Sequence, residues 1–239
     1  MDRLAELIAA RLPPRREPRT PAPKLDEATL RAALAGILAG RRTGERLHLF
    51  SYGALMWERD VVPGAEANPA EAPGFARSFC LRDIHTRGVP EAPGLTLGIR
   101  PAPGARCGGL LYALPEEPEA EARALLTAWR QEMSPGFYTP AWLEALPHPQ
   151  GRVTRAIGFL ADPAHPLFVG DMPEGEQAKV LATAVGPQGP DAEYLRRADG
   201  MLRDLGLPDP ALDQLTRRVS AMLEGMVGAT GIEPVTLRV

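Results

Sequence analysis

Residues 47–57 read LHLFSYGALMW and mark the point at which the sequence changes from helical to strand periodicity. Here His48, Phe50 and Tyr52 alternate with the residues between them, as the two faces of a β-strand do. Gly53 follows where the chain is expected to turn. This stretch therefore predicts the first strand of a sheet, ending in a tight bend.

Further β-rich runs follow at residues 75–84, 95–100, 107–114 and 153–160. We expect Pro-Gly turns to separate them, at Pro93-Gly94 and Pro103-Gly104. A helix is predicted at residues 116–133, and three more are predicted from Glu174 onward. Strands mostly first and helices later indicate an α+β fold, with an antiparallel sheet or small β-barrel packed by helices.

The first 45 residues differ from the rest of the chain. Residues 2–12 and 26–38 have the spacing of amphipathic helices, and the proline- and arginine-rich residues 13–23 between them predict a linker. We therefore expect an N-terminal helical extension with a Pro-rich linker at residues 1–45, and a catalytic domain at residues 46–239. The extension is expected to supply an oligomer contact or a lid, and the sequence leaves both open.

Composition narrows the class of partner. The 239 residues are 44% hydrophobic and carry a net charge of −3, with basic residues scattered among acidic ones. We expect no nucleic acid and no membrane as partner, because the chain has neither a basic stripe nor an apolar run of about 18 residues. The N-terminus does not read as a secretion signal, so a cytoplasmic location is expected. Nucleotide-binding and zinc motifs are also missing.

Glu132 is the residue that periodicity marks as unusual. It continues a helical stripe formed by Ala122, Leu125 and Trp129, a face that should turn inward. Burying a carboxylate without a partner costs several kcal/mol or makes it keep a proton, and a raised pKa suits a general acid or base. Alternatively, Glu132 lies in a frayed last turn and reaches water, because Pro135-Gly136 ends the helix.

The bend after Tyr52 is the second candidate. A strand that ends in Tyr-Gly can expose backbone N–H groups, which bind a carboxylate or a developing oxyanion. An ordinary β-turn is the alternative reading.

Several sequence blocks occur in a fixed order around these candidates. They are YGAL at 52–55, FCLR at 79–82, RGVPEAPGLTLG at 87–98, CGGLLY at 107–112, WRQEM at 129–133 and GPQGPDAEYL at 186–195. Together they resemble the ChaC family of glutathione-specific γ-glutamylcyclotransferases, whose members carry a Tyr-Gly-Ser-Leu loop, an Arg-Gly-x-Pro-x-x-Pro-Gly block and a glutamate at a helix end. The resemblance covers about residues 47–206.

This resemblance implies a lyase with the γ-glutamylcyclotransferase-like fold, which cleaves glutathione into 5-oxoproline and Cys-Gly. Its catalytic glutamate falls on Glu132 as general acid/base, and its substrate-binding loop falls on Tyr52, Gly53, Ala54 and Leu55. No cofactor and no metal are needed, because the substrate's own amine attacks its γ-carbonyl and effective molarities of such reactions reach roughly 10⁵ to 10⁸ M. The sequence departs from the family at Ala54, where the loop has serine, and at Asp191, where asparagine is usual.

Other residues have weaker support. The resemblance suggests that Tyr194 points its hydroxyl into the pocket. Arg87 is a candidate to bind a substrate carboxylate, such as the glycine end, or else to stabilise a turn. His85 is a less favoured base, and Cys80 and Cys107 are expected in the core.

Two rival functions stay open at this point. One keeps the reaction but uses another γ-glutamyl peptide or amine. The other is a non-catalytic protein that binds a γ-glutamyl ligand or a protein partner, with Ala54 marking a degenerate site. The oligomeric state is not predicted.

Overall fold

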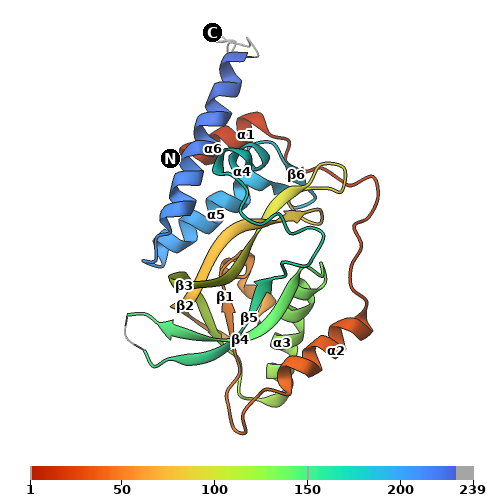
Figure 1. Cartoon of the computed structure of the whole chain (residues 1–239), viewed down its shortest axis with the longest axis vertical. Helices are drawn as coiled ribbons and strands as arrows, with labels where there is room; N and C mark the ends of the chain where they lie inside the picture. The colour runs from red at the N-terminus through yellow and green to blue at the C-terminus, as the bar shows by residue number, and fades with distance from the viewer. Residues whose placement is uncertain (1, 150, 230–239) are drawn as a thin grey trace, which may run out of the picture.

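A long hairpin of β2 and β3 is the framework of the computed structural model, which describes residues 2–149 and 151–229. In this described chain, five strands close into a barrel in the order β1-β3-β2-β4-β5, because β5 pairs back with β1, and β3 also pairs with β5. The barrel strands are β1 His48–Ser51, β2 Glu66–Asp83, β3 Gly94–Ala113, β4 Tyr138–Pro147 and β5 Thr154–Ala161, and a small separate sheet holds β6 Val185–Gly186 and β7 Gly189–Pro190. The predicted α+β fold with a small barrel is confirmed (Figure 1).

The turn expected at Pro103-Gly104 is wrong, because β3 runs through it without ending. Gly104 has a φ of 83° and Gly74, on the opposite strand, has a φ of 79°. Both are left-handed conformations that glycine adopts at little cost. The β2–β3 register shifts between Pro73 and Phe75, so each strand bends at its glycine and continues.

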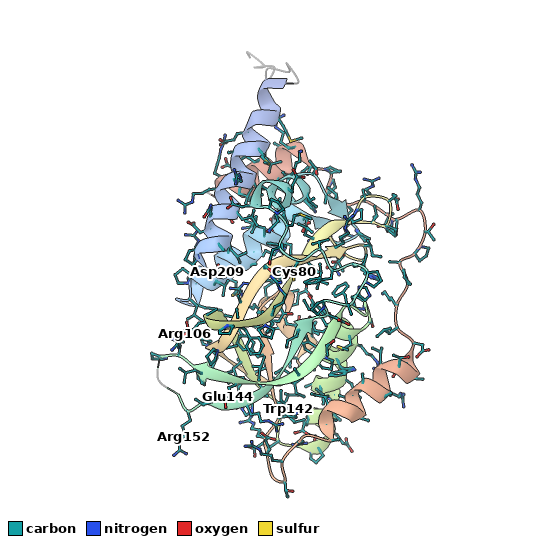
Figure 2. The ribbon with its side chains drawn as sticks, viewed as in Figure 1. Cys80, Arg106, Trp142, Glu144, Arg152 and Asp209 are labelled. Carbon is teal, nitrogen blue, oxygen red and sulfur yellow. The ribbon has the colours of Figure 1, made fainter. Side chains whose placement is uncertain are left out.

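The strand β4 is not predicted by the sequence, because Pro140 and Pro147 break its pattern. Pro140 lies opposite Phe159 of β5. On its other edge β4 pairs with β2 only at the far end of the strand, so no described strand pairs with that edge at Pro140, where the missing N–H would otherwise be needed. Glu144, labelled in Figure 2, lies in this strand with an exposed side chain.

Two helices cover one side of the barrel. They are α2 Glu27–Leu38 and α3 Pro118–Met133, and α2 contacts both α3 and β4. The Glu117 carboxylate caps α3 by accepting hydrogen bonds from its first free N–H groups. The indole of Trp129 is buried and donates to the carbonyl of Leu30 at 2.9 Å, which ties α3 to α2.

The remaining α-helices gather at the opposite end of the molecule (Figure 1). They are α1 Arg3–Arg11, α4 Glu174–Leu181, α5 Asp191–Asp204 and α6 Pro210–Ala229, and α6 contacts the other three. The three C-terminal helices are therefore confirmed. We call this group the helical cap.

Arg77 joins the helical cap to the barrel. Its buried guanidinium donates to the carbonyls of Tyr52 at 3.0 Å and Gly108 at 2.9 Å, and it pairs with Asp209 at 2.7 Å. Asp209, labelled in Figure 2, also accepts from the first N–H groups of α6. One side chain thus fixes the end of β1, strand β3 and the start of α6.

Residues 13–25, which we call the strap, connect α1 to α2 along one side of the molecule (Figure 1). The N–H of Arg16 donates to the carbonyl of Gly186 at 3.1 Å, and the N–H of Leu25 donates to that of Ser134 at 2.9 Å. The strap therefore bridges from the β6–β7 loop to the end of α3.

The division at residue 46 stays a prediction, and residues 230–239 of the second unit lie outside the described residues. None of the described helices is long and apolar enough to cross a membrane.

Candidate active site

A cavity of about 320 Å³ lies between the end of β1, the end of α3 and the turn after β2. Every residue predicted for the site lines this cavity: Tyr52, Gly53, Ala54, Leu55, Arg87, Glu132 and Tyr194. The fold thus brings together residues that are far apart in the sequence. Their chemical roles stay predictions.

The loop after β1 presents free backbone groups to the cavity. The chain turns through Gly53 into a short 3₁₀ helix, η1 Ala54–Met56, and a second one, η2 Arg59–Val61, follows it. Across the described residues, the N–H groups of Gly53, Ala54 and Leu55 donate no hydrogen bond. Such free amides can receive a carboxylate or an oxyanion.

Gly53 is required by a close contact rather than by its φ, which is −133°. A Cβ at this position would lie 2.9 Å from the hydroxyl of Tyr194. The Tyr194 ring, near the start of α5, is held edge-on by Trp57 and Phe79, with ring centres 5.5 and 5.9 Å away. The phenol hydroxyl therefore lies beside Gly53 at the start of the loop.

The buried face of α3 is displaced from the predicted stripe. Ala122 is exposed, and the inward residues are Ala124, Leu125, Ala128, Trp129 and Met133. Glu132 lies at the border of this face, where it is partly buried and lines the cavity. Because the helix ends only after Met133, Glu132 is held in a regular turn.

The Glu132 carboxyl has no hydrogen bond or ion pair in the part of the chain that the structure describes. Burial raises its pKa from 4.5 to about 8, and the nearby negative charge of Glu58 adds to this rise. Its accessible surface faces the cavity, so the proton of this carboxyl is both retained near neutral pH and reachable by a ligand.

Two buried phenols pack beside Glu132 with their hydroxyls already engaged. The hydroxyl of Tyr52 donates to the carbonyl of Phe159, and that of Tyr138 donates to the carbonyl of Leu97 at 2.6 Å. Burial raises the pKa of Tyr52 well above its ordinary value, so it stays protonated. The hydroxyl of Tyr52 is therefore not available to a ligand in the cavity.

The turn after β2 is organised by Asp83, which is buried. Its carboxylate accepts from the N–H groups of His85 and Thr86 at 2.8 Å and of Arg87 at 3.1 Å, and from the Thr86 hydroxyl. These bonds satisfy the charge of Asp83 and fix the turn.

Arg87 is also buried, and it stands against the site rather than in solvent. Its guanidinium donates to the carbonyl of Gln188 at 2.5 Å and lies 5.8 Å from the centre of the Tyr194 ring. The residue therefore has both a structural contact and a position on the cavity wall.

Asp191 does not line the cavity. It is fully buried, and its Oδ2 accepts from the N–H of Leu95 at 2.6 Å, while its Oδ1 has no partner in the described chain. Burial raises the pKa of Asp191 well above its ordinary value, with opposing effects from the Leu95 bond and Arg87 and a further rise from Asp83. A protonated Asp191 matches the uncharged asparagine of the resemblance.

The weaker candidates have separate fates. His85 lines the cavity, and burial lowers its pKa. Cys80 and Cys107 are buried and free, and burial raises the pKa of Cys107 to about 11, so neither is a ready nucleophile. Among the described side chains, no group of three or more His, Cys, Asp or Glu residues is arranged to hold a metal ion.

The lining residues that sequence reasoning missed include Lys24, Thr96, Tyr138 and Gln188. Thr96 interacts with the phenols of both Tyr138 and Tyr194. Gln188 and Thr96 lie within sequence blocks that carry the family resemblance, so the resemblance could have pointed to them as site residues. Lys24 lies in the linker, where no sequence pattern pointed to a site residue.

Comparison with known proteins agrees with the geometry. A family described as ChaC-like protein matches residues 47–222. The glutathione-specific γ-glutamylcyclotransferase of Escherichia coli (strain K12) is 36% identical over 192 residues, which is 80% of each chain. The γ-glutamylcyclotransferase 2-3 of Arabidopsis thaliana is 26% identical over 179 residues, 73% of this chain and 89% of the relative.

The fold has a match among solved structures. The crystal structure of a γ-glutamyl cyclotransferase specific to glutathione from yeast aligns with a TM-score of 0.65 and 21% identity, over 74% of this chain and 97% of that chain. At this identity the likeness shows a shared fold.

Proposed function

The chain belongs to the ChaC-like family and is a γ-glutamylcyclotransferase, and from this premise we propose that its cavity cleaves glutathione with Glu132 as the general acid and base. The observation that carries the role of Glu132 is its unpaired, cavity-lining carboxyl with a pKa of about 8. A carboxyl with a pKa near neutral pH takes up and releases protons efficiently.

The reaction needs little from the protein beyond orientation. The α-amine of the γ-glutamyl group attacks the γ-carbonyl of the same residue, a five-membered ring closes, and the bond to the cysteine nitrogen breaks. The products are 5-oxoproline and Cys-Gly. Holding the amine against the carbonyl supplies most of the rate, as in other oriented intramolecular reactions.

Glu132 performs both proton transfers in this scheme. As a carboxylate it takes a proton from the substrate ammonium, which frees the amine for attack. The protonated Glu132 then gives this proton to the departing nitrogen of Cys-Gly, and the second proton that the ring nitrogen loses on closure passes through the same carboxyl to the new amine or to water. The partly closed surroundings of Glu132 support the role, because they favour the neutral form between the two steps.

The free amides of Gly53, Ala54 and Leu55 bind negative oxygen in the proposal. They receive the α-carboxylate of the γ-glutamyl group or the oxyanion formed from its carbonyl. Arg87 and Tyr194 support this end of the substrate, because the Tyr194 hydroxyl lies beside Gly53 and Arg87 lies against the Tyr194 ring. Ala54 leaves this cradle intact, since its contribution comes from the backbone.

We also propose a cytoplasmic location. The support is chemical: both cysteines are unpaired and buried, as in proteins kept in a reducing compartment. Fractionation of cells that express the chain at its natural level checks this.

The function is tested by incubating the purified protein with reduced glutathione and measuring 5-oxoproline. We expect steady release by the wild type, and a loss of roughly 10³-fold in kcat for Glu132→Gln, in line with the 10²- to 10⁴-fold range for removed acid–base groups. Glu144→Gln is the matched control, because Glu144 is exposed on β4. Equal product from wild type and Glu132→Gln would refute the role of Glu132, and no product from the wild type would refute the activity.

Thermal unfolding shows whether Glu132→Gln folds. The direction in which its Tm differs from that of the wild type follows from the pKa of Glu132. The pKa of Glu132 rises from 4.5 to about 8 on folding, so this group's contribution to stability is full below about pH 4.5 and is lost as the pH rises through about 8. Glu132→Gln has no carboxyl at this position, so its stability does not fall in this way as the pH rises. Its Tm should therefore match the wild type near pH 5 and exceed it near pH 8.5, by roughly 2–4 °C for each kcal/mol.

A further inference from the structure

Three cationic side chains line the cavity, and two of them already have a partner within the protein. Arg130 pairs with Glu27 at 2.7 Å, and Arg87 donates to the carbonyl of Gln188 at 2.5 Å. Lys24 forms no hydrogen bond or ion pair with any described residue, and it is exposed. Its ammonium is therefore the positive charge at this cavity that the fold leaves for a ligand.

The backbone around Lys24 is anchored, so its place on the cavity is defined. On one side the N–H of Leu25 donates to the carbonyl of Ser134, and the Leu25 side chain packs against Gly136, beyond the end of α3. On the other side of this anchor, Asp26 caps α2 by accepting from the N–H of Thr29 at 2.7 Å. Lys24 is thus tied to the helix end that carries Glu132.

The charge of Lys24 reaches into the cavity. Burial lowers the pKa of His85, the negative charge of Asp83 opposes this, and Lys24 adds to the lowering. Since His85 belongs to the turn after β2, the ammonium acts across the space between that turn and α3.

Lys24 also lies outside the segment that the family shares, which begins at residue 47. The strap therefore adds to the cavity a group that the common barrel does not provide. This distinguishes Lys24 from Arg87, which lies against Tyr194 and the loop amides.

We propose that Lys24 is a specificity-determining residue, whose ammonium pairs with the carboxylate at the C-terminal end of a γ-glutamyl peptide substrate. The inference rests on the proposed function. The loop amides take the α-carboxylate or oxyanion at the reacting end, so the far carboxylate must find another cation. Lys24 stands at the strap with no partner among the described residues and supplies it, in place of the Arg87 contact that the sequence suggested.

The test compares glutathione with its C-terminal amide, in which the glycine carboxylate is a neutral carboxamide. Release of 5-oxoproline is measured for wild type, Lys24→Met and Lys24→Arg. We expect the wild-type KM to be about tenfold higher for the amide, which corresponds to about 1.4 kcal/mol. Lys24→Met should show this higher KM with both substrates and an unchanged kcat, while Lys24→Arg should keep most of the preference.

Lys179 is the matched control, because Lys24 and Lys179 are the two lysines of the chain. Lys179 lies on α4, away from the cavity lining, and Lys179→Met should behave as the wild type with both substrates. Added salt gives a second readout: it should raise the wild-type KM for glutathione and leave that of Lys24→Met unchanged.

The outcomes separate the two proposals. If wild type and Lys24→Met prefer glutathione over the amide equally, or if Lys24→Met loses activity equally on both substrates, the role of Lys24 is overturned while the activity stands. If the wild type releases no 5-oxoproline from either substrate, the proposed function and the Lys24 inference are both overturned.

Discussion

On one wall of the cavity, the N–H groups of Gly53 to Leu55 and the carboxyl of Glu132 have no partner among the described residues. On another wall, the backbone of the turn at residues 83–87 is held by hydrogen bonds, and we call this the saturated wall: Asp83 accepts several of them and Arg87 donates to Gln188, while Nδ1 of His85 has no partner among the described residues. Unpaired polar groups cost stability, and a ligand that completes them is one physical reason for a fold to keep them. The comparison teaches that the groups we propose as reactive lie on the unpaired wall, whereas the saturated wall shapes the space.

After the loss of Glu132 itself, the largest effect should come from breaking the unpaired wall sterically. In Gly53→Ala the new Cβ would lie 2.9 Å from the Tyr194 hydroxyl, so the loop or the ring must move. We expect kcat/KM for glutathione to fall by about 100-fold, since a misplacement of about 1 Å can cost that much. Steady-state release of 5-oxoproline measures it.

A double variant shows whether this contact is the cause. Tyr194→Phe removes the hydroxyl, so Gly53→Ala combined with Tyr194→Phe should be no slower than Tyr194→Phe alone. Gly200→Ala on α5 is the control, because nothing lies within 4 Å of its Cβ position. Losses that multiply in the double variant would contradict the proposed contact.

The next effect is the pH dependence of the unpaired carboxyl. Glu132 must be ionised to take the first proton, and burial raises its pKa to about 8. The kcat/KM should therefore rise by about tenfold from pH 7 to pH 9 and then level off. The residual rate of Glu132→Gln corrects for titration of the substrate amine. A wild-type profile that is level down to pH 5 would mean that Glu132 titrates as an ordinary glutamate.

A smaller effect on the rate is expected from the saturated wall. Asp83→Asn keeps the side-chain shape but loses an acceptor for the N–H groups of the turn. The free energy of unfolding should fall by about 2 kcal/mol, while kcat/KM falls only about fivefold. Calorimetry and steady-state kinetics measure the two.

Asp162→Asn is the control for this change, because Asp162 accepts a similar bond from the N–H of Ala164 outside the cavity. A fall in kcat as large as that of the Gly53 variant, without loss of stability, would show that the two walls do not differ as described.

The smallest effect is expected from Ala54→Ser, which restores the serine suggested by the family resemblance. The backbone amide at this position is unchanged, so the hydroxyl adds one neutral hydrogen bond at most. Such a bond contributes about 1 kcal/mol, or roughly a fivefold gain in kcat/KM. Initial rates at low glutathione detect it. A gain of 100-fold would mean that the loop depends on its side chain rather than on its amides.

How far the sequence predicts this structure depends on how local each signal is. The strand at residues 47–52 and the helix at 116–133 are predicted correctly: the strand stands out by its alternating β-rich pattern although both of its faces are buried, and one buried face sets the period of the helix. Strand β4 and the first half of β2 were missed, since pairing with neighbouring strands overrides the prolines at positions 69, 73 and 140. Such pairing is not visible in a local pattern.

The same reasoning applies to the site. Glu132 and the loop at Tyr52 to Leu55 stood out through periodicity and through the resemblance. The position of Glu132 at the border of the buried face, with Ala122 exposed, required the packing of α3 on the barrel. Lys24 was out of reach for sequence reasoning, because only the path of the strap brings residue 24 beside the end of α3.

The contacts of Arg77 determine when the loop after β1 becomes fully anchored during synthesis of the chain. The Arg77 guanidinium holds the carbonyl of Tyr52, yet its carboxylate partner Asp209 is 132 positions further along the chain. As the ribosome extends the polypeptide, the barrel is synthesised long before that partner emerges. A nascent chain therefore carries an incompletely anchored substrate loop, and anchoring of that loop is finished only with the start of the last helix.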